Sequence, residues 1–205
     1  MSDTQNPIEI ERKFTLKNDN WKAWSYKTIE MVQGYFTGDT CPVTFDGLHL
    51  RIGQFTIKPE EHFVNILPEL LVTGTENISP QLCAVRIRSE NGLYKLTIKK
   101  RIDSNSCHEM EYLIPEGIGR YHLERTDCKL LKTRYLVGIG NNKTAEVDVY
   151  HGENSNMPNT AEVEFINQET ADSFETPAWF DKELTGMSEF SCKALAETPY
   201  NARQK

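Results

Sequence analysis

The sequence predicts an α+β fold in which about eight antiparallel strands close into a β-barrel, with helices packed on the outside. Two observations predict it. Segments that alternate apolar and polar residues recur along most of the chain, as they do in strands with one buried face. Within these segments charged residues repeat at every second position, so they share one face of each strand. If the charged faces turn inward, the apolar outer faces need helices to cover them.

Eight segments carry the strand pattern, and four others suit helices. The predicted strands are 7–16, 33–37, 84–89, 93–101, 108–114, 132–139, 145–150 and 161–165. We expect helices over 18–32, 127–131, 168–175 and 187–197, and a long hairpin loop over 152–159. The sequence contains no internal repeat, so we expect one domain spanning residues 1–205.

Residues 38–83 interrupt the alternation with Pro, Gly and short apolar patches. We therefore expect an insertion at about 38–83 with a hairpin of its own, which closes one mouth of the barrel or forms an interface. Arg51 lies inside it. A surface strand is the simpler expectation for this residue, and entry into the barrel is the alternative.

The composition excludes several classes of protein. The 205 residues include 23 Lys and Arg against 30 Asp and Glu, a net charge of −7, so we expect no nucleic-acid partner. No apolar run approaches the ~18 residues of a membrane helix, and the N-terminal sequence does not resemble a secretion signal, so we expect no membrane partner. The five cysteines are scattered without metal-ligand spacing and predict reduced thiols in a cytoplasmic protein.

Pairs of like charge stand two residues apart in seven places within the predicted strands. These pairs are Glu9 and Glu11, Arg86 and Arg88, Lys99 and Arg101, Glu109 and Glu111, Lys132 and Arg134, Glu146 and Asp148, and Glu162 and Glu164. A solvated outer face explains any single pair, but such faces usually mix both signs and neighbouring like charges repel. The repetition favours an inward ionic lumen. Clustered carboxylates there suit Mg²⁺ or Mn²⁺, and rows of Arg and Lys suit a short chain of phosphates.

The order of these residues resembles that of the CYTH family, the triphosphate tunnel metalloenzymes. Glu9-Ile-Glu11-Arg-Lys13 resembles the E-x-E-x-K signature with which the family begins. Further matches follow in order: Gln33-Gly34-Tyr35-Phe36, Arg86-Ile-Arg88, Thr97-Ile-Lys99, Glu109-x-Glu111, Lys132-x-Arg134-Tyr135, Glu146-Val-Asp148, Glu162-Val-Glu164-Phe165 and Lys182-Glu183-Leu184-Thr185. One E-x-E-x-K is weak, whereas nine ordered elements outside 38–83 are specific.

The resemblance implies an eight-stranded antiparallel tunnel that binds a triphosphate and two divalent ions, Mg²⁺ or Mn²⁺. The residues that resemble the family's metal ligands are Glu9, Glu11, Asp148, Glu162 and Glu164, with Glu111 as a further candidate. Those that resemble its triphosphate-binding residues are Lys13, Arg86, Arg88, Lys99, Arg134 and Lys182, with Tyr35 as a further candidate. Lys95 is an alternative to Lys99, Lys182 has the alternative of capping a C-terminal segment, and Glu109 and Glu146 suit ion-pair partners.

The function implied by the resemblance is metal-dependent hydrolysis of a triphosphate, with inorganic tripolyphosphate as the first candidate substrate. A class IV adenylate cyclase-type lyase, a thiamine triphosphatase and a non-catalytic polyphosphate- or nucleotide-binding protein are the alternatives. Family members often pair, so a homodimer is also consistent with the resemblance.

Overall fold

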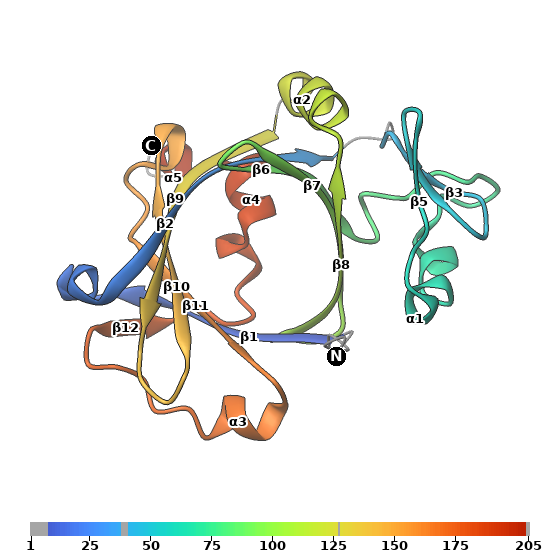
Figure 1. Cartoon of the computed structure of the whole chain (residues 1–205). Coiled ribbons are helices and arrows are strands. Elements are labelled where there is room, and N and C mark those ends of the chain that lie inside the picture. The colour runs from blue at the N-terminus through green and yellow to red at the C-terminus, as the bar shows by residue number, and fades with distance from the viewer. Residues whose placement is uncertain (1–7, 38–40, 127, 204–205) are drawn as a thin grey trace.

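The computed structural model describes residues 8–37, 41–126 and 128–203 of the chain. Its main body is a closed antiparallel barrel (Figure 1). The eight barrel strands are β1 (Ile8–Leu16), β2 (Ser25–Phe36), β6 (Ala84–Glu90), β7 (Leu93–Arg101), β8 (Ser106–Ile114), β9 (Cys128–Gly138), β10 (Thr144–Tyr150) and β11 (Thr160–Phe165). The order around the barrel is β11-β10-β9-β2-β6-β7-β8-β1, and pairing of β1 with β11 closes it. The predicted fold class is confirmed.

The seams between strands differ in length. Strand β2 pairs with β9 over ten residue pairs and β7 with β8 over eight, whereas β1 meets β8 at only three and β10 meets β11 at only three. Between the two short seams, β1 and β11 pair over six. The second half of β1 also pairs with a short strand, β12 (Phe180–Glu183), which is added to the edge of the barrel.

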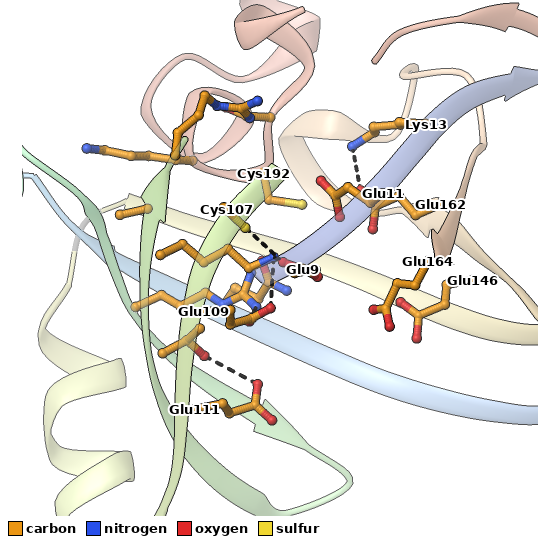
Figure 2. A pocket seen from close by; sticks show the side chains of 18 of the residues that line it. Glu9, Glu11, Lys13, Cys107, Glu109, Glu111, Glu146, Glu162, Glu164 and Cys192 are labelled. Carbon is orange, nitrogen blue, oxygen red and sulfur yellow. Dashed lines mark hydrogen bonds and ion pairs between the residues drawn. The ribbon is translucent and has the colours of Figure 1, made fainter. Parts of the chain in front are cut away.

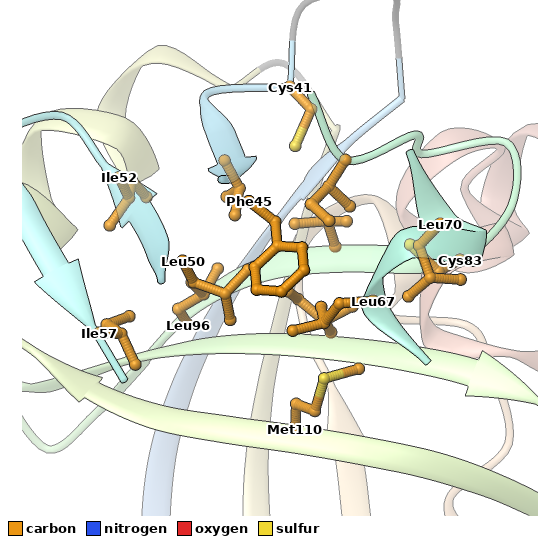
Figure 3. Close-up of a cluster of buried hydrophobic side chains, with 14 of the residues drawn as sticks. Cys41, Phe45, Leu50, Ile52, Ile57, Leu67, Leu70, Cys83, Leu96 and Met110 are labelled. Atoms are coloured by element: carbon orange, nitrogen blue, oxygen red, sulfur yellow. The ribbon is translucent and has the colours of Figure 1, made fainter. Parts of the chain in front are cut away.

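The inserted segment packs against a side wall of the barrel. It forms a three-stranded sheet of β3 (Val43–Phe45), β4 (Leu50–Ile52) and β5 (Phe55–Ile57), followed by α1 (Glu61–Val64) and the 3-10 helix η2 (Leu67–Leu70). Figure 3 shows Phe45, Leu50 and Leu67 packed over Leu96 and Met110, which point outward from β7 and β8. An inserted sheet, in place of the expected helices, therefore covers this apolar wall.

Arg51 has the simpler of its two expected positions. It lies on β4, is exposed, and its Nη2 donates to Asp46 Oδ2 at 2.7 Å. It does not reach the interior of the barrel.

A second apolar cluster covers the opposite wall, where Phe14 of β1 packs against Phe180 and Phe165 packs against Phe174. It includes α3 (Gln168–Asp172) and Trp21 of the 3-10 helix η1 (Asn20–Trp24). The helix predicted over 18–32 is wrong: only one short turn forms, and β2 begins at Ser25. The spacing of the two tryptophans suggested one buried helix face, but Trp21 is fully buried whereas Trp24 is 57% exposed.

The segment before β9 also differs from the prediction. Residues 128–131 belong to β9 and pair with β2, so the helix expected over 127–131 is wrong over these residues, and Asp127 lies outside the described residues. The helix here is instead α2 (Glu116–Arg125). Its C-terminal end packs against Gly34, where a Cβ atom would lie 2.3 Å from Thr126 Cγ2.

The C-terminal segment covers one end of the barrel. It contains the 3-10 helix η4 (Ser188–Phe190), α4 (Cys192–Glu197) and α5 (Tyr200–Arg203), and α4 crosses the barrel opening in the view of Figure 1. Leu195 packs with Tyr35, Leu130 and Tyr150, while η3 (Gly152–Asn154) hydrogen-bonds to the same segment through Asn154. Among the described helices, none is long and apolar enough to cross a membrane.

Candidate active site

The barrel encloses a cavity of about 1060 Å³ lined by charged side chains from every barrel strand except β2, which contributes uncharged side chains (Figure 2). Alternate residues of each strand face it, because side chains of a strand point to opposite sides in turn. The basic residues that line it are Lys13, Arg86, Arg88, Lys95, Lys99, Arg101, Lys132, Arg134 and Lys193. The acidic residues that line it are Glu9, Glu11, Glu90, Glu109, Glu111, Glu146, Glu162 and Glu164.

Strand register places opposite charges side by side across the seams. Lys13 of β1 lies opposite Glu162 of β11, and Lys99 of β7 lies opposite Glu109 of β8. These contacts compensate part of the charge on each strand, which lowers the cost of burying it. Other positions place like charges opposite one another, as Glu11 and Glu164 are and as Glu146 and Glu162 are. The cavity carries nearly balanced charge of both signs.

One ionic cluster is built around Asp148, which is fully buried. Lys132 Nζ lies 2.5 Å from its Oδ2, and Arg134 contacts both of its carboxylate oxygens at 2.8 Å. Arg134 also pairs with Glu146, and its Nη2 lies 2.8 Å from Glu162 Oε2. The two cations hold the pKa of Asp148 below its usual value against the opposing effect of burial.

The other ionic cluster lies on β6, β7 and β8. Arg88 pairs with Glu90 and Glu111, and Lys95 lies 3.0 Å from Glu90 and 2.7 Å from Glu111. A guanidinium and an ammonium therefore share two carboxylates at this position.

Lys99 connects this cluster to β1. Its Nζ lies 2.6 Å from Glu9 Oε2 and 3.0 Å from Glu109 Oε2, while Arg86 is 3.4 Å from Glu109. Burial, together with the neighbouring carboxylates Glu109 and Glu11, raises the pKa of Glu9 to about 8 although Lys99 opposes them. Burial also acts to raise the pKa of Glu109, but Lys99 and Arg86 hold it at about 2. The two carboxylates titrate as a pair, in which Glu9 is the weaker acid.

Two carboxylates of the cavity form no direct ion pair within the described part of the chain, although Lys99 attracts both at longer range. The side chains of Glu11 and Glu164 form none of the hydrogen bonds or ion pairs found among the described residues. Burial raises the pKa of Glu164 to about 7, and Glu146, close to it in Figure 2, adds repulsion. Glu164 keeps contact with solvent, which screens this repulsion.

These carboxylates suit a hard divalent cation, because several oxygen donors crowd together without enough positive charge beside them. Glu11 and Glu164 meet that description, and Glu9 and Glu146 extend the group although each has one basic partner, Lys99 and Arg134 respectively. In this conformation no three carboxylate, histidine or cysteine side chains of the described residues converge as closely as metal ligands do. The donor set thus has the right chemistry, and its members have to move together to surround an ion.

Most of the predicted site residues come together in the cavity, and two do not. Those that line it are Glu9, Glu11, Lys13, Tyr35, Arg86, Arg88, Lys99, Glu111, Arg134, Glu162 and Glu164. Asp148 is absent from the lining because Lys132 and Arg134 enclose it. Lys182 is exposed on β12, outside the barrel, because β12 lies along the edge of β1. In this structure neither residue therefore lies on the lining of the cavity.

Several cavity residues lie outside the predicted set. Lys132, Glu146 and Glu109 belong to like-charged pairs already recognised, and Lys95 was the alternative to Lys99. Extending the period of two along each strand would have found all four. Gln33, which is neutral, gives no such signal, although it lies two residues from Tyr35 on the inward face of β2.

The C-terminal segment contributes to the cavity as well. Leu184, Met187, Phe190 and Cys192 line it, and Lys13 Nζ donates to the Phe190 carbonyl oxygen at 3.0 Å. Lys13 therefore holds both Glu162 and this backbone segment.

Comparison with known proteins agrees with this geometry. A protein named inorganic triphosphatase from Nitrosomonas europaea is 28% identical over 188 residues, which cover 92% of this chain and 96% of the relative. A crystal structure of an inorganic triphosphatase aligns with a TM-score of 0.54 at 22% identity, covering 92% of this chain and 93% of the other, which shows a shared fold. No family model matches the sequence. The aligned relative, the shared fold and the charged tunnel agree with the resemblance of the sequence to the CYTH, or triphosphate tunnel, family.

Proposed function

We propose that this protein hydrolyses a triphosphate inside the barrel, with inorganic tripolyphosphate as the preferred substrate. The observation that carries the proposal is the cavity itself, in which nine basic and eight acidic side chains face one enclosed space of about 1060 Å³. A polyphosphate that carries divalent cations presents both signs of charge at once, as this lining requires. The name of the aligned Nitrosomonas europaea relative agrees with such a substrate.

The basic side chains would bind the phosphate chain. Arg86, Arg88 and Arg134 present planar guanidinium groups that can grip two oxygens each, while Lys13 and Lys99 act as point charges. In the free protein their partners are carboxylates, so substrate oxygens would replace some of these ion pairs. The same cations would stabilise the negative charge that spreads over the transferred phosphoryl group.

The unpaired and crowded carboxylates would hold the divalent ions, for which we propose Mg²⁺ or Mn²⁺. Glu9, Glu11, Glu162 and Glu164 lie on the adjacent strands β1 and β11, and Glu146 and Glu111 extend the set. Bound there, a divalent ion would polarise phosphate oxygens and lower the pKa of a water molecule. Asp148 acts differently in this proposal, because it keeps Lys132 and Arg134 in place from behind the cavity wall.

The decisive experiment incubates the protein with tripolyphosphate, thiamine triphosphate and ATP, each with Mg²⁺ and with Mn²⁺. Release of inorganic phosphate, fastest from tripolyphosphate, is the expected result. Formation of cyclic AMP with pyrophosphate would instead indicate a lyase. Tight binding without any product would indicate a non-catalytic binding protein.

Two lysine variants provide the matched comparison. Lys99→Met removes a cation that faces the cavity, and we expect kcat/KM to fall by about 100-fold. Lys58→Met makes the same change on the exposed end of the inserted sheet and should stay within about twofold of the parent. Equal activity of both variants would contradict a reaction inside the tunnel.

We further propose that the protein works in the cytoplasm. All five cysteines are free thiols, and this is typical of a reducing compartment.

A further inference from the structure

Gln33 presents a buried hydrogen-bond donor that nothing in the protein satisfies. Its side chain faces the cavity from β2 and is completely buried, yet its amide nitrogen Nε2 has no partner among the described residues. Buried polar groups are nearly always hydrogen-bonded, and one left unsatisfied in the free protein needs a reason. A ligand that supplies the missing acceptor is such a reason.

The orientation of this amide is fixed by a chain of hydrogen bonds. Arg86 Nη1 donates to the hydroxyl oxygen of Tyr35 at 3.3 Å, and that hydroxyl donates its proton to Gln33 Oε1 at 2.8 Å. Burial raises the pKa of Tyr35 to about 12, so the hydroxyl keeps its proton at neutral pH. With Oε1 held by Tyr35, the NH₂ end of the amide is directed away from the tyrosine and is free for another partner.

The surroundings of Gln33 favour an anionic acceptor. Register places Gln33 opposite Arg88 and Tyr35 opposite Arg86 on the neighbouring strand β6. Arg86 has a second unmet donor, since its Nε also has no partner among the described residues. Donors left over beside two guanidinium groups call for oxygens that carry negative charge and no protons, as phosphate oxygens do.

We propose that Gln33 is a further triphosphate-binding residue, whose Nε2 donates to a phosphate oxygen, and that Tyr35 is the positioning residue that orients its amide. This inference rests on the proposed function and adds a residue to the site. Unlike the nine cations of the lining, Gln33 is neutral, so its hydrogen bond responds to geometry and only weakly to ionic strength. Tyr35 would then act through Gln33, because its only proton is already donated.

Calorimetric titration of the protein with tripolyphosphate in EDTA tests this binding without turnover. We compare the parent with Gln33→Met, Tyr35→Phe and the double variant, and use Gln54→Met in the exposed β4–β5 turn as the control. Gln33→Met should weaken binding about tenfold, equally at low and high salt, because it removes one hydrogen bond and no charge. Tyr35→Phe should weaken binding less, and the double variant should bind no more weakly than Gln33→Met alone.

The thermal midpoint of the ligand-free protein separates binding from folding. Gln33→Met removes a donor that is unsatisfied without ligand, but it also removes the acceptor of the Tyr35 hydroxyl proton, so we expect a lower midpoint and compare affinities only at temperatures where the variant is folded. If Gln33→Met unfolds, the nearly isosteric Gln33→Glu replaces it, and should bind at least tenfold more weakly because a carboxylate repels phosphate.

The outcomes are distinct. Parental affinity in a folded Gln33→Met or Gln33→Glu would overturn the assignment of Gln33, and additive losses in the double variant would overturn the positioning role of Tyr35. If the parent neither binds tripolyphosphate in EDTA nor hydrolyses it with Mg²⁺ or Mn²⁺, the proposed function fails, and this inference fails with it. If it hydrolyses tripolyphosphate without binding it in EDTA, an unchanged KM of Gln33→Met with Mg²⁺ would overturn the assignment of Gln33.

Discussion

Asp148 is enclosed by Lys132 and Arg134, and replacing it with Asn should destabilise the protein far more than it affects metal binding. Its side chain is 0% exposed, and those of Lys132 and Arg134 are 1% and 9% exposed. The substitution leaves an ammonium at 2.5 Å and a guanidinium at 2.8 Å facing a neutral amide. Removing one member of a buried ion pair costs about 3–5 kcal/mol, because the remaining charge stays buried without compensation. For a chain of this size the thermal midpoint should fall by roughly 6–20 °C.

The assay is thermal unfolding followed by tryptophan fluorescence, in EDTA and again with saturating Mg²⁺. Glu146→Gln is the matched control on the same strand. Glu146 is 27% exposed, and after its substitution Arg134 still forms ion pairs with Asp148 and Glu162. We expect Glu146→Gln to lose only about 1 kcal/mol without metal and to lose part of the Mg²⁺-induced stabilisation. An Asp148→Asn protein as stable as the parent in EDTA, but no longer stabilised by Mg²⁺, would refute our placement of Asp148 behind the cavity wall.

Four further predictions follow from the same structure. Lys182→Met should keep kcat/KM for tripolyphosphate within about twofold of the parent, since β12 lies outside the barrel, and a tenfold loss would contradict this. The unfolding free energy of the metal-free protein should fall as the pH rises from about 5 to about 8, because folding raises the pKa of Glu9 and the unfolded chain releases its proton first; urea unfolding of Glu9→Gln should show a shallower fall. Mg²⁺ should raise the thermal midpoint of the parent, and Glu162→Gln should reduce both this shift and turnover; an unchanged shift would argue against Glu162 as a ligand. Phe45→Ala, in the core between the inserted sheet and the barrel, should cost about 3–5 kcal/mol in urea unfolding, and a loss below about 1 kcal/mol would show that the inserted sheet contributes little.

The sequence was sufficient to predict the barrel because a period of two is a direct consequence of strand geometry. Every strand that carries a like-charged pair has the expected inward face, and Glu9, Arg88 and Glu164 do share one cavity. The period of two does not predict where along the barrel axis a side chain lies, or whether side chains of the next strand enclose it. It places Glu146 and Asp148 on one face, but only the register with β9 decides that Asp148 meets Arg134 and is enclosed.

The misses have local physical causes. The spacing of Trp21 and Trp24 suits a helix, yet burial of Trp21 against Tyr135 needs only one 3-10 turn before β2 begins. Lys182 carries the charge of a phosphate-binding residue, but four residues of strand at the edge of β1 direct it to solvent. Gln33 is neutral, and we single it out because its buried amide nitrogen has no hydrogen-bond acceptor. Such a missing partner can be recognised only when the positions of all neighbouring side chains are known.

The number of residue pairs between neighbouring strands differs around the barrel and divides its wall into two parts. Strands β1 and β11 form a two-stranded panel, joined to the other six strands by only three residue pairs on either side. That panel carries Glu9, Glu11, Glu162 and Glu164, whereas most of the arginines stand on the broadly paired remainder. If these carboxylates bind cations and the arginines bind phosphate, as we propose, the two kinds of ligand stand on differently paired parts of the wall, and a small movement of the panel would change the distance between a bound cation and the guanidinium groups.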